Sequence, residues 1–254
     1  MPTIPQRIVS LVPSITETLA ALGVRERVVG RTRYCVHPRP WVDALPAVGG
    51  TKDPDARAIA ALRPDLIVVN REENRPAQFP ELAAIAPLHE TYPRTVDGAL
   101  EELADLARRV GAAAAGDALL ARIRRERDAA RAAAAGREPF TYAYMIWRRP
   151  WMSVNADTFV HALLAEIGGV NVLAGRAERY PQVSAEELLS AAPRHVLLST
   201  EPYDFRLAHA AELPGLESRC RLVDGELLSW HGSRMELAFP YLGELLRELR
   251  TASP

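Results

Sequence analysis

The first half of the chain alternates short apolar runs with longer stretches of helical periodicity. The apolar runs predict strands over residues 7–12, 27–31, 66–70 and 87–92, and the stretches between them predict helices over 14–23, 55–62, 78–85 and 96–110. Ser14 and Glu17 form a capping-box pattern, which predicts that Ser14 caps the first of these helices. Strands that alternate with helices in this way indicate an α/β architecture with a parallel sheet.

A long stretch rich in alanine and arginine follows, over residues 113–135. It holds no glycine or proline between Gly116 and Gly136, and its composition strongly favours a helix. About 20 residues of helix make a rod roughly 30 Å long. A basic helix could bind nucleic acid or a membrane surface, but Glu126 and Asp128 stand among the arginines. We therefore interpret the stretch as a solvated connecting helix.

The alternating pattern begins again after Gly136. Strands are predicted over 140–146, 195–200 and 221–223, and helices over 158–167, 184–190 and 233–250. Ser184 with Glu187, and Ser233 with Glu236, repeat the capping-box pattern at the starts of two of these helices. The whole chain is thus predicted to form an N-terminal α/β lobe over 1–112, a bridging helix over 113–136 and a C-terminal α/β lobe over 137–254.

Composition narrows the class of protein. The 254 residues include 31 basic and 32 acidic side chains, so no basic surplus is available for phosphate contacts, and a nucleic-acid partner is not expected. No apolar run approaches the roughly 18 residues that cross a bilayer. Cys35 and Cys220 are too few for a disulfide framework. The first residues lack the pattern of a signal peptide. The expectation is a globular, monomeric protein that is not embedded in a membrane.

Candidate binding residues gather in the loops that follow the predicted strands. Ligands of parallel α/β sheets bind beyond the carboxyl ends of the strands. Three of the four tryptophans lie in these loops, and the single lysine, Lys52, lies in a glycine-rich loop where an ammonium group is not equivalent to a guanidinium. The predicted ligand-binding residues are Tyr34, Lys52, Glu73, Arg75, Trp147, Arg148, Trp151, Tyr180, Glu201, Tyr203, Trp230, His231 and Arg234.

Catalytic and metal chemistry is less clearly indicated. The chain lacks a Gly-x-Ser-x-Gly elbow, a Walker A loop, a His-Glu-x-x-His pair and a Gly-x-Gly-x-x-Gly loop, so no catalytic residue is predicted. Cys35 and His37 stand two residues apart, but no second pair follows to complete a structural zinc site. His37 and His231 remain candidate metal ligands, with Cys35 and Glu73 as further members of the set.

Four segments carry a resemblance to a known family. They are Arg7–Gly23, Ala61–Val69, Gly168–Asn171 and Tyr180–Leu189, and they resemble the class III periplasmic substrate-binding proteins, the vitamin B12, siderophore and haem receptors of ABC importers. The chain is most similar to the B12-binding branch. The resemblance implies two Rossmann-like lobes with parallel sheets, a long helix between them and a ligand cleft between the lobes.

The same resemblance implies a function. A metal chelate would be clamped by the lobes, a corrinoid such as cobalamin first and an iron-siderophore or haem next, with no enzymatic activity and no required cofactor. An ABC-importer permease would be the partner, and the location would be the periplasm or the cell surface. Glu186 matches a glutamate that docks on the permease, and Trp230 matches a ligand-binding tryptophan of the family.

Two departures leave an alternative open. Arg57 stands where the other docking glutamate is expected in the first lobe, and the chain as given shows no signal peptide. An intracellular, cytoplasmic metal-binding protein, metallochaperone or enzyme on the same fold is that alternative. In the loop over 72–75, Glu73 and Arg75 are predicted to face the ligand, while Glu72 is predicted to pair with a neighbouring arginine.

Overall fold

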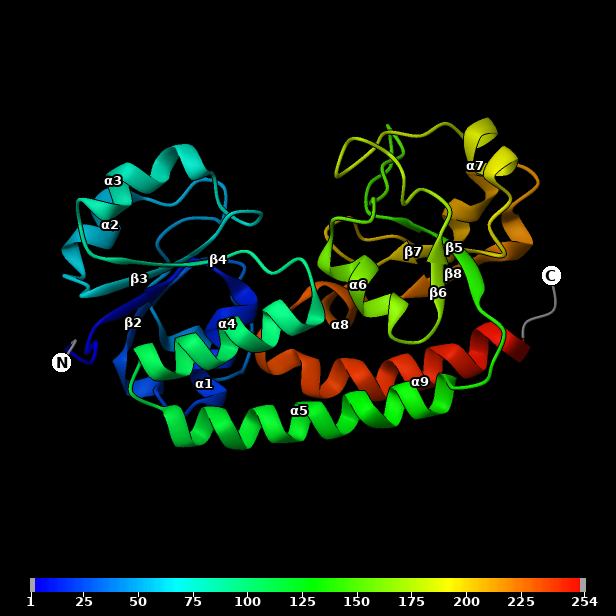
Figure 1. The fold of residues 1–254 in the computed structure, drawn as a ribbon. Helices are drawn as coiled ribbons and strands as arrows, with labels where there is room; N and C mark the ends of the chain where they lie inside the picture. Colours follow the sequence, from blue (N-terminus) through cyan, green and yellow to red (C-terminus); the bar gives the residue numbers. More distant parts are fainter. Residues whose placement is uncertain (1–2, 252–254) are drawn as a thin grey trace. The chain divides into compact units, whose positions relative to one another are not determined.

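The chain folds into two α/β units, and the computed structural model describes residues 3–251 (Figure 1). The first unit consists of residues 3–93, 97–122 and 231–234, and the second contains the remainder of the described chain. The boundaries differ from the predicted lobes at two short segments. Residues 94–96 come from the N-terminal half of the chain but belong to the second unit. Residues 231–234 come from the C-terminal half of the chain but belong to the first unit.

The sheet of the first unit contains four parallel strands. They are β1 (Ile8–Ser10), β2 (Val28–Arg31), β3 (Leu66–Asn70) and β4 (Leu88–Thr91), in the order β2-β1-β3-β4. Each lies within a predicted strand, and the parallel pairing that the strand–helix alternation predicted is confirmed. Every residue of β1 and β3 is buried, because helices cover both faces of a parallel sheet.

Helices pack on both sides of this sheet. They are α1 (Pro13–Ala21), α2 (Ala56–Ala61), α3 (Phe79–Ala83) and α4 (Val96–Arg109), with short 3-10 turns at Arg25–Arg27, Val42–Ala44 and Pro76–Gln78. One core cluster joins Val9, Ile67 and Val69 of the sheet to Ile59 of α2 and Leu82 of α3. Helices α1 and α4 lie on the opposite side (Figure 1).

The predicted cap of the first helix is wrong. Helix α1 begins at Pro13, its N-cap is Val12, and no side chain caps it. Proline is favoured at the first helical position because its fixed φ suits a helix and its missing N–H would lack a helical partner there. Ser14 therefore lies inside the helix, and Glu17 is available for a different contact, described below.

Helix α5 (Ala113–Ala134) is the predicted connecting helix, and its 22 residues are continuous. The boundary between the two units falls inside it, between Arg122 and Ile123. In the second unit, Arg127 and Arg131 of this helix both contact Glu166, at 2.8 and 2.5 Å. Burial opposes ionisation of Glu166, but the two guanidinium groups dominate and lower its pKa.

The second unit repeats the architecture. Its strands β5 (Phe140–Met145), β6 (Gly169–Asn171), β7 (His195–Ser199) and β8 (Cys220–Val223) are parallel in the order β6-β5-β7-β8. Strand β6 was not predicted, because the sequence Gly-Val-Asn has no apolar run and follows Gly168, a typical helix stop. Its register comes from pairing with β5.

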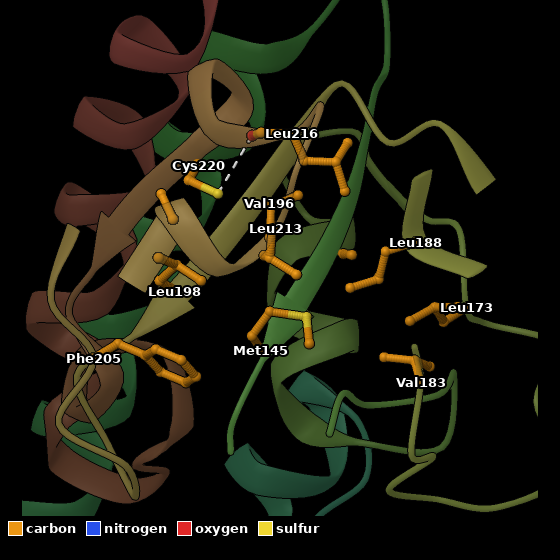
Figure 2. Close-up of a cluster of buried hydrophobic side chains, with 12 residues drawn as sticks. Met145, Leu173, Val183, Leu188, Val196, Leu198, Phe205, Leu213, Leu216 and Cys220 are labelled. Atoms are coloured by element: carbon orange, nitrogen blue, oxygen red, sulfur yellow. Dashed lines mark hydrogen bonds between the residues drawn. The ribbon is translucent and has the colours of Figure 1, made fainter. Parts of the chain in front are cut away.

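The helices of the second unit are α6 (Phe159–Ala165), α7 (Ala185–Ala191), α8 (Gly225–Ser229) and α9 (Met235–Thr251). The capping box of Ser184 and Glu187 is confirmed, whereas the short helix α8 was not predicted. Figure 2 shows a core cluster in which Met145 and Leu198 of the sheet meet Phe205 and Leu213 of the loops. Trp151 and Tyr203 pack against this cluster, so two candidate ligand-binding residues rest on the core.

Among residues 3–251, no helix has the length and apolar character needed to cross a membrane.

Candidate functional site

Two asparagines organise the carboxyl end of the sheet in the first unit. Asn74 accepts a hydrogen bond from the backbone N–H of Asn70 (2.8 Å) and donates to the carbonyl oxygens of Leu11 (3.1 Å) and Thr51 (2.9 Å). The side-chain oxygen of Asn70 accepts hydrogen bonds from the backbone N–H groups of Glu72 and Glu73. Because both asparagines are buried and their bonds tie three loops together, they hold the backbone that carries Lys52, Glu73 and Arg75.

The charged residues predicted to bind ligand in the first unit lie on the loops that Asn70 and Asn74 hold. Lys52 donates from Nζ to the carbonyl oxygen of Glu72. Glu73 is exposed, yet enough protein surrounds it for desolvation to raise its pKa; Lys52 lowers that pKa and Glu72 raises it further. Arg71, one of the two arginines that neighbour Glu72, pairs with Glu90. Arg75 is exposed at the start of the 3-10 turn that precedes α3.

The loop after β2 contains the candidate thiol and an exposed ring. Cys35 is buried and contacts the hydroxyl groups of Thr16 (3.1 Å) and Thr32 (3.2 Å), and burial raises its pKa. A buried thiol with a raised pKa is a poor metal ligand and a poor nucleophile. Tyr34 is exposed, with the guanidinium of Arg33 5.0 Å from its ring centroid.

Residues 231–234 are held against α1 within the first unit. Gly232 has φ +88°, and a Cβ at this position would lie 2.2 Å from Oγ1 of Thr18, so the close approach requires glycine. The backbone N–H of Ser233 donates to Oγ1 of Thr18 (2.9 Å). Arg234 forms a two-bond ion pair with Glu17, at 2.8 and 3.1 Å. Glu17 therefore serves as the ion-pair partner of Arg234. The guanidinium of Arg234, which was predicted to bind ligand, is already paired with this carboxylate.

Aromatic side chains meet at the carboxyl end of the sheet in the second unit. Trp147 lies edge-on to Tyr203, with ring centroids 5.4 Å apart, and remains 42% exposed. Trp151 is stacked on Phe205 at 5.6 Å with nearly parallel rings, and Tyr203 contacts Phe205 at 4.8 Å. These contacts fix the rings against the core, and Trp147 presents the most exposed tryptophan surface of the group.

Two arginines share one carboxylate beside these rings. Arg148 and Arg149 approach the same oxygen of Glu212, at 3.0 and 3.2 Å. The guanidinium of Arg148 lies 5.9 Å from the ring centroid of Tyr203, and its Nε is buried without a hydrogen-bond partner among the described residues. The three charges leave a net positive charge beside an exposed aromatic surface.

Trp230 and Glu201 contact one another directly. The indole N–H of Trp230 donates to Oε2 of Glu201 (2.7 Å), and Trp230 itself is buried. Gly225 permits the tight loop, because a Cβ there would lie 2.5 Å from the backbone nitrogen of Glu201. In the same unit Tyr180 is exposed beneath the guanidinium of Arg179, which pairs with Asp157 at 2.7 Å.

No group of three or more His, Cys, Asp and Glu side chains in the described part of the chain, residues 3–251, is arranged to hold a metal ion. The predicted set of Cys35, His37, Glu73 and His231 is thus not brought together as such a group. His231 is buried, and desolvation lowers its pKa to about 4, which keeps the ring neutral at neutral pH. The assignment of His37 and His231 as metal ligands stays a prediction.

Two charged residues occupy comparable places on the two units. Arg57 is exposed in the first turn of α2, and Glu186 is exposed in the first turn of α7. A negative charge is favoured near the positive end of a helix dipole, and backbone and Ser184 hydrogen bonds lower the pKa of Glu186. Glu186 therefore presents a negative charge on an exposed surface, whereas Arg57 presents a positive one.

The residues that sequence reasoning missed act by supporting others. Asn70, Asn74 and Glu212 each hold a backbone segment or a guanidinium, and none belongs to a recognisable motif. Glu17 was assigned to a capping box, but it pairs with Arg234 instead. The only signal for Asn70 was its place at the end of a strand, where a polar side chain meets the carboxyl edge of the sheet.

The fold and these loops define an α/β binding protein with two units of like architecture. Residues 8–217 match the family of periplasmic binding proteins. The match covers most of the chain, so the chain belongs to this family.

Relatives place it more closely. It is 26% identical over 255 residues to the vitamin B12-binding protein of Pectobacterium atrosepticum, covering 98% of this chain and 91% of the relative. It is also 26% identical over 200 residues to the vitamin B12-binding protein of Vibrio cholerae, covering 76% and 70%. The chain is thus a class III periplasmic binding protein near the B12-binding branch, and its matched relatives are binding proteins rather than enzymes.

Solved structures agree on the fold. The periplasmic haem-binding protein RhuT of Roseiflexus sp. RS-1, in its apo form, is 25% identical with a TM-score of 0.84 over 96% of this chain and 98% of that one. The periplasmic vitamin B12-binding protein of Vibrio cholerae superimposes with a TM-score of 0.83 over 98% and 99% of the two chains, at 22% identity.

Proposed function

We propose that this protein binds a metal chelate and delivers it to an ABC importer, with a corrinoid such as cobalamin as the first candidate and haem or an iron-siderophore as the next. The observation that carries the proposal is the group of Trp147, Tyr203 and the two neighbouring arginines, Arg148 and Arg149, at the carboxyl edge of the second sheet. Flat rings fixed on a core suit a large planar ligand, and guanidinium groups suit its carboxylate or phosphate substituents.

The relatives support the same class of ligand. A relative that this chain matches over 91% of its length is named for vitamin B12, and a structural neighbour at 25% identity is named for haem. Both ligands are metal-containing macrocycles with apolar faces and polar edges. On this proposal Lys52, Glu73 and Arg75 of the first unit are ligand-binding residues as well, because their charged groups suit the polar substituents of a chelate.

Titration tests the proposal directly. Purified protein is titrated with cyanocobalamin, haem and a ferric siderophore, with tryptophan fluorescence and calorimetry as readouts. Binding of at least one of them in the micromolar range or tighter supports the role. No binding below about millimolar for any of the three overturns it.

A tryptophan pair provides a matched control. Trp147→Leu removes the exposed ring of the proposed site and is expected to weaken binding at least tenfold, about 1.4 kcal/mol. Trp41→Leu removes a tryptophan whose ring lies under the guanidinium of Arg25. Arg25 belongs to the 3-10 turn just before β2, so this tryptophan lies toward the amino end of the strand and not its carboxyl end. Trp41→Leu is expected to leave affinity within twofold. Equal losses in the two variants would contradict the placement of the site.

The importer partner follows from the same role. Glu186, exposed on α7, is the proposed contact with the permease, and a periplasmic or surface location is the proposed setting. Glu186→Arg is expected to reduce uptake of the labelled chelate by cells while leaving its affinity for the purified protein unchanged. Unchanged uptake would remove Glu186 from the docking surface.

A further inference from the structure

Arg149 holds a backbone conformation that arginine rarely adopts. Its φ is +62°, in the left-handed region that side chains other than those of glycine and asparagine avoid. Glycine would take this conformation without steric cost. Strain of this kind persists where the surrounding structure enforces it, and it concentrates at functional sites.

The surrounding turn explains how the strain is enforced. The backbone N–H of Met152 donates to the carbonyl of Trp147 (3.0 Å), and that of Ile146 donates to the carbonyl of Met152 (3.0 Å). This bridge closes a tight turn directly after β5, with Arg149 inside it. The turn thus fixes Arg149 at the carboxyl edge of the sheet, between the exposed Trp147 and the partly buried Trp151.

The two arginines of the turn differ in their surroundings. The side chain of Arg148 is only 11% exposed, and it lies against Tyr203 as well as Glu212. The side chain of Arg149 is 74% exposed, and its contact with Glu212 is the outer of the two. One carboxylate cannot neutralise two guanidinium groups, so the cluster keeps a positive charge, and Arg149 presents that charge to solvent.

We propose that Arg149, rather than Arg148, receives the anionic group of the ligand, a carboxylate or phosphate at the edge of a macrocycle whose face lies against Trp147. Arg148 instead positions Tyr203 and Glu212. Glu212 holds Arg149 by one exposed contact in the absence of ligand, and such a contact is weak enough to be exchanged for a ligand oxygen. This inference rests on the proposed function, and it adds the chemical class of the group that is recognised.

Removal of the side chain together with its strain provides the test. Arg149→Gly eliminates the guanidinium and gives the turn the residue its backbone favours, so the melting temperature is expected to stay within about 3 °C of the wild type or to rise. The matched control is Arg63→Gly. Arg63 is also exposed, has φ +47°, and lies just before β3, at the amino end of its strand.

Two pairs of probes separate the recognised group from the rest of the ligand. Haem is compared with its dimethyl ester, in which both carboxylates are esterified, and cyanocobalamin with dicyanocobinamide, which lacks the phosphate together with the ribose and benzimidazole of the nucleotide loop. For whichever pair binds, the wild type is expected to prefer the anionic member at least fivefold. Arg149→Gly is expected to lose at least fivefold in affinity for that member, with less than twofold change for the neutral one. Arg63→Gly is expected to retain the preference.

The outcomes distinguish this inference from the function on which it rests. If neither pair binds the wild type, the role of Arg149 is overturned, and the proposed function is overturned with it when the ferric siderophore does not bind either. If the wild type binds a pair but prefers neither member, or if Arg149→Gly keeps the wild-type preference, the proposed function stands and the role of Arg149 fails. An equal loss of affinity for both members of the pair in Arg149→Gly would also reject the role of Arg149, because that result indicates general damage to the site.

Discussion

The carboxyl edges of the two sheets are built in different ways. In the first unit, the buried amides of Asn70 and Asn74 bond to backbone groups of three loops, and the exposed residues are charged. In the second unit, Trp151 and Phe205 stack on one another and anchor Tyr203 on the apolar core. The first edge is organised by hydrogen bonds to the backbone, and the second by the packing of rings.

This difference shows how one architecture can supply two kinds of binding surface. Hydrogen bonds set the course of a loop closely but leave its outward side chains mobile in water. Packed rings are themselves the surface, because a ring fixed by the core exposes its outer face or edge without further loss of conformational freedom. Mutations should therefore affect the two edges by different mechanisms.

The largest expected effect is on the packed edge. Phe205→Ala removes a ring that is 1% exposed, and it should lower the free energy of unfolding by about 3–5 kcal/mol through lost burial and a cavity. Urea denaturation measures the change, and native-state hydrogen exchange shows whether it is confined to the second unit. A loss below about 1 kcal/mol would mean that the rings do not depend on this packing.

A substitution on the hydrogen-bonded edge of the first unit should lower the free energy of unfolding somewhat less. Asn74→Ala leaves the carbonyls of Leu11 and Thr51 and the N–H of Asn70 without their side-chain partner, and the expected loss is about 2–3 kcal/mol. Hydrogen exchange should increase around residues 70–75. The control Glu81→Ala, at an exposed position of α3, should change stability by less than about 0.5 kcal/mol.

Side chains carried by the asparagine scaffold should affect binding rather than stability. Glu73→Ala and Arg75→Ala are each expected to weaken chelate binding at least tenfold, about 1.4 kcal/mol. Glu72→Ala should weaken it much less, because Lys52 contacts the backbone carbonyl of Glu72, which the substitution keeps. Calorimetric titration gives the three affinities, and similar small losses in all of them would identify the loop as ordinary solvated surface.

The remaining expected effect is on the pH dependence of stability, and it has opposite signs in the two units. In the first unit, burial raises the pKa of Glu102 to about 7 while its carboxylate accepts the N–H of Tyr92 (2.9 Å), with Asp105 and Glu90 nearby. Between about pH 4.5 and 7 the folded state binds more protons at this group than the unfolded state does. Its contribution to stability therefore falls as pH rises through that window.

In the second unit, burial and the nearby Arg221 and Arg194 lower the pKa of His195 to about 4. Between about pH 4 and 6.5 the unfolded state binds more protons at this group, so its contribution to stability rises with pH. Melting curves recorded from pH 5 to 8 test the two opposite contributions, that of Glu102 and that of His195. Glu102→Gln should remove the falling component, so that stability rises more steeply with pH than in the wild type. An unchanged profile would show that Glu102 is ionised throughout.

Several elements were predictable because their signals are local. The apolar run of β3, the alanine-rich helix α5 and the capping box of Ser184 each lie within one continuous stretch of the chain. The cap assigned to Ser14 failed although its pattern is local as well. Pro13 begins the helix one residue earlier, and Glu17 is paired with an arginine more than 200 residues away in the chain. A local pattern cannot show that a distant partner competes for one of its members.

The sequence by itself determined the alternation of strands and helices, the parallel sheets and the loops in which the site residues lie. It did so because hydrophobic periodicity and the carboxyl-end rule depend on chain order alone. Tertiary structure decided which guanidinium groups already have partners, which rings are covered and which asparagines support a loop. Arg234 and Arg149 look alike in the sequence, but one is held by Glu17 against α1 and the other is exposed in a strained turn. Their difference arises from contacts between residues far apart in the chain, and only folding brings those residues together.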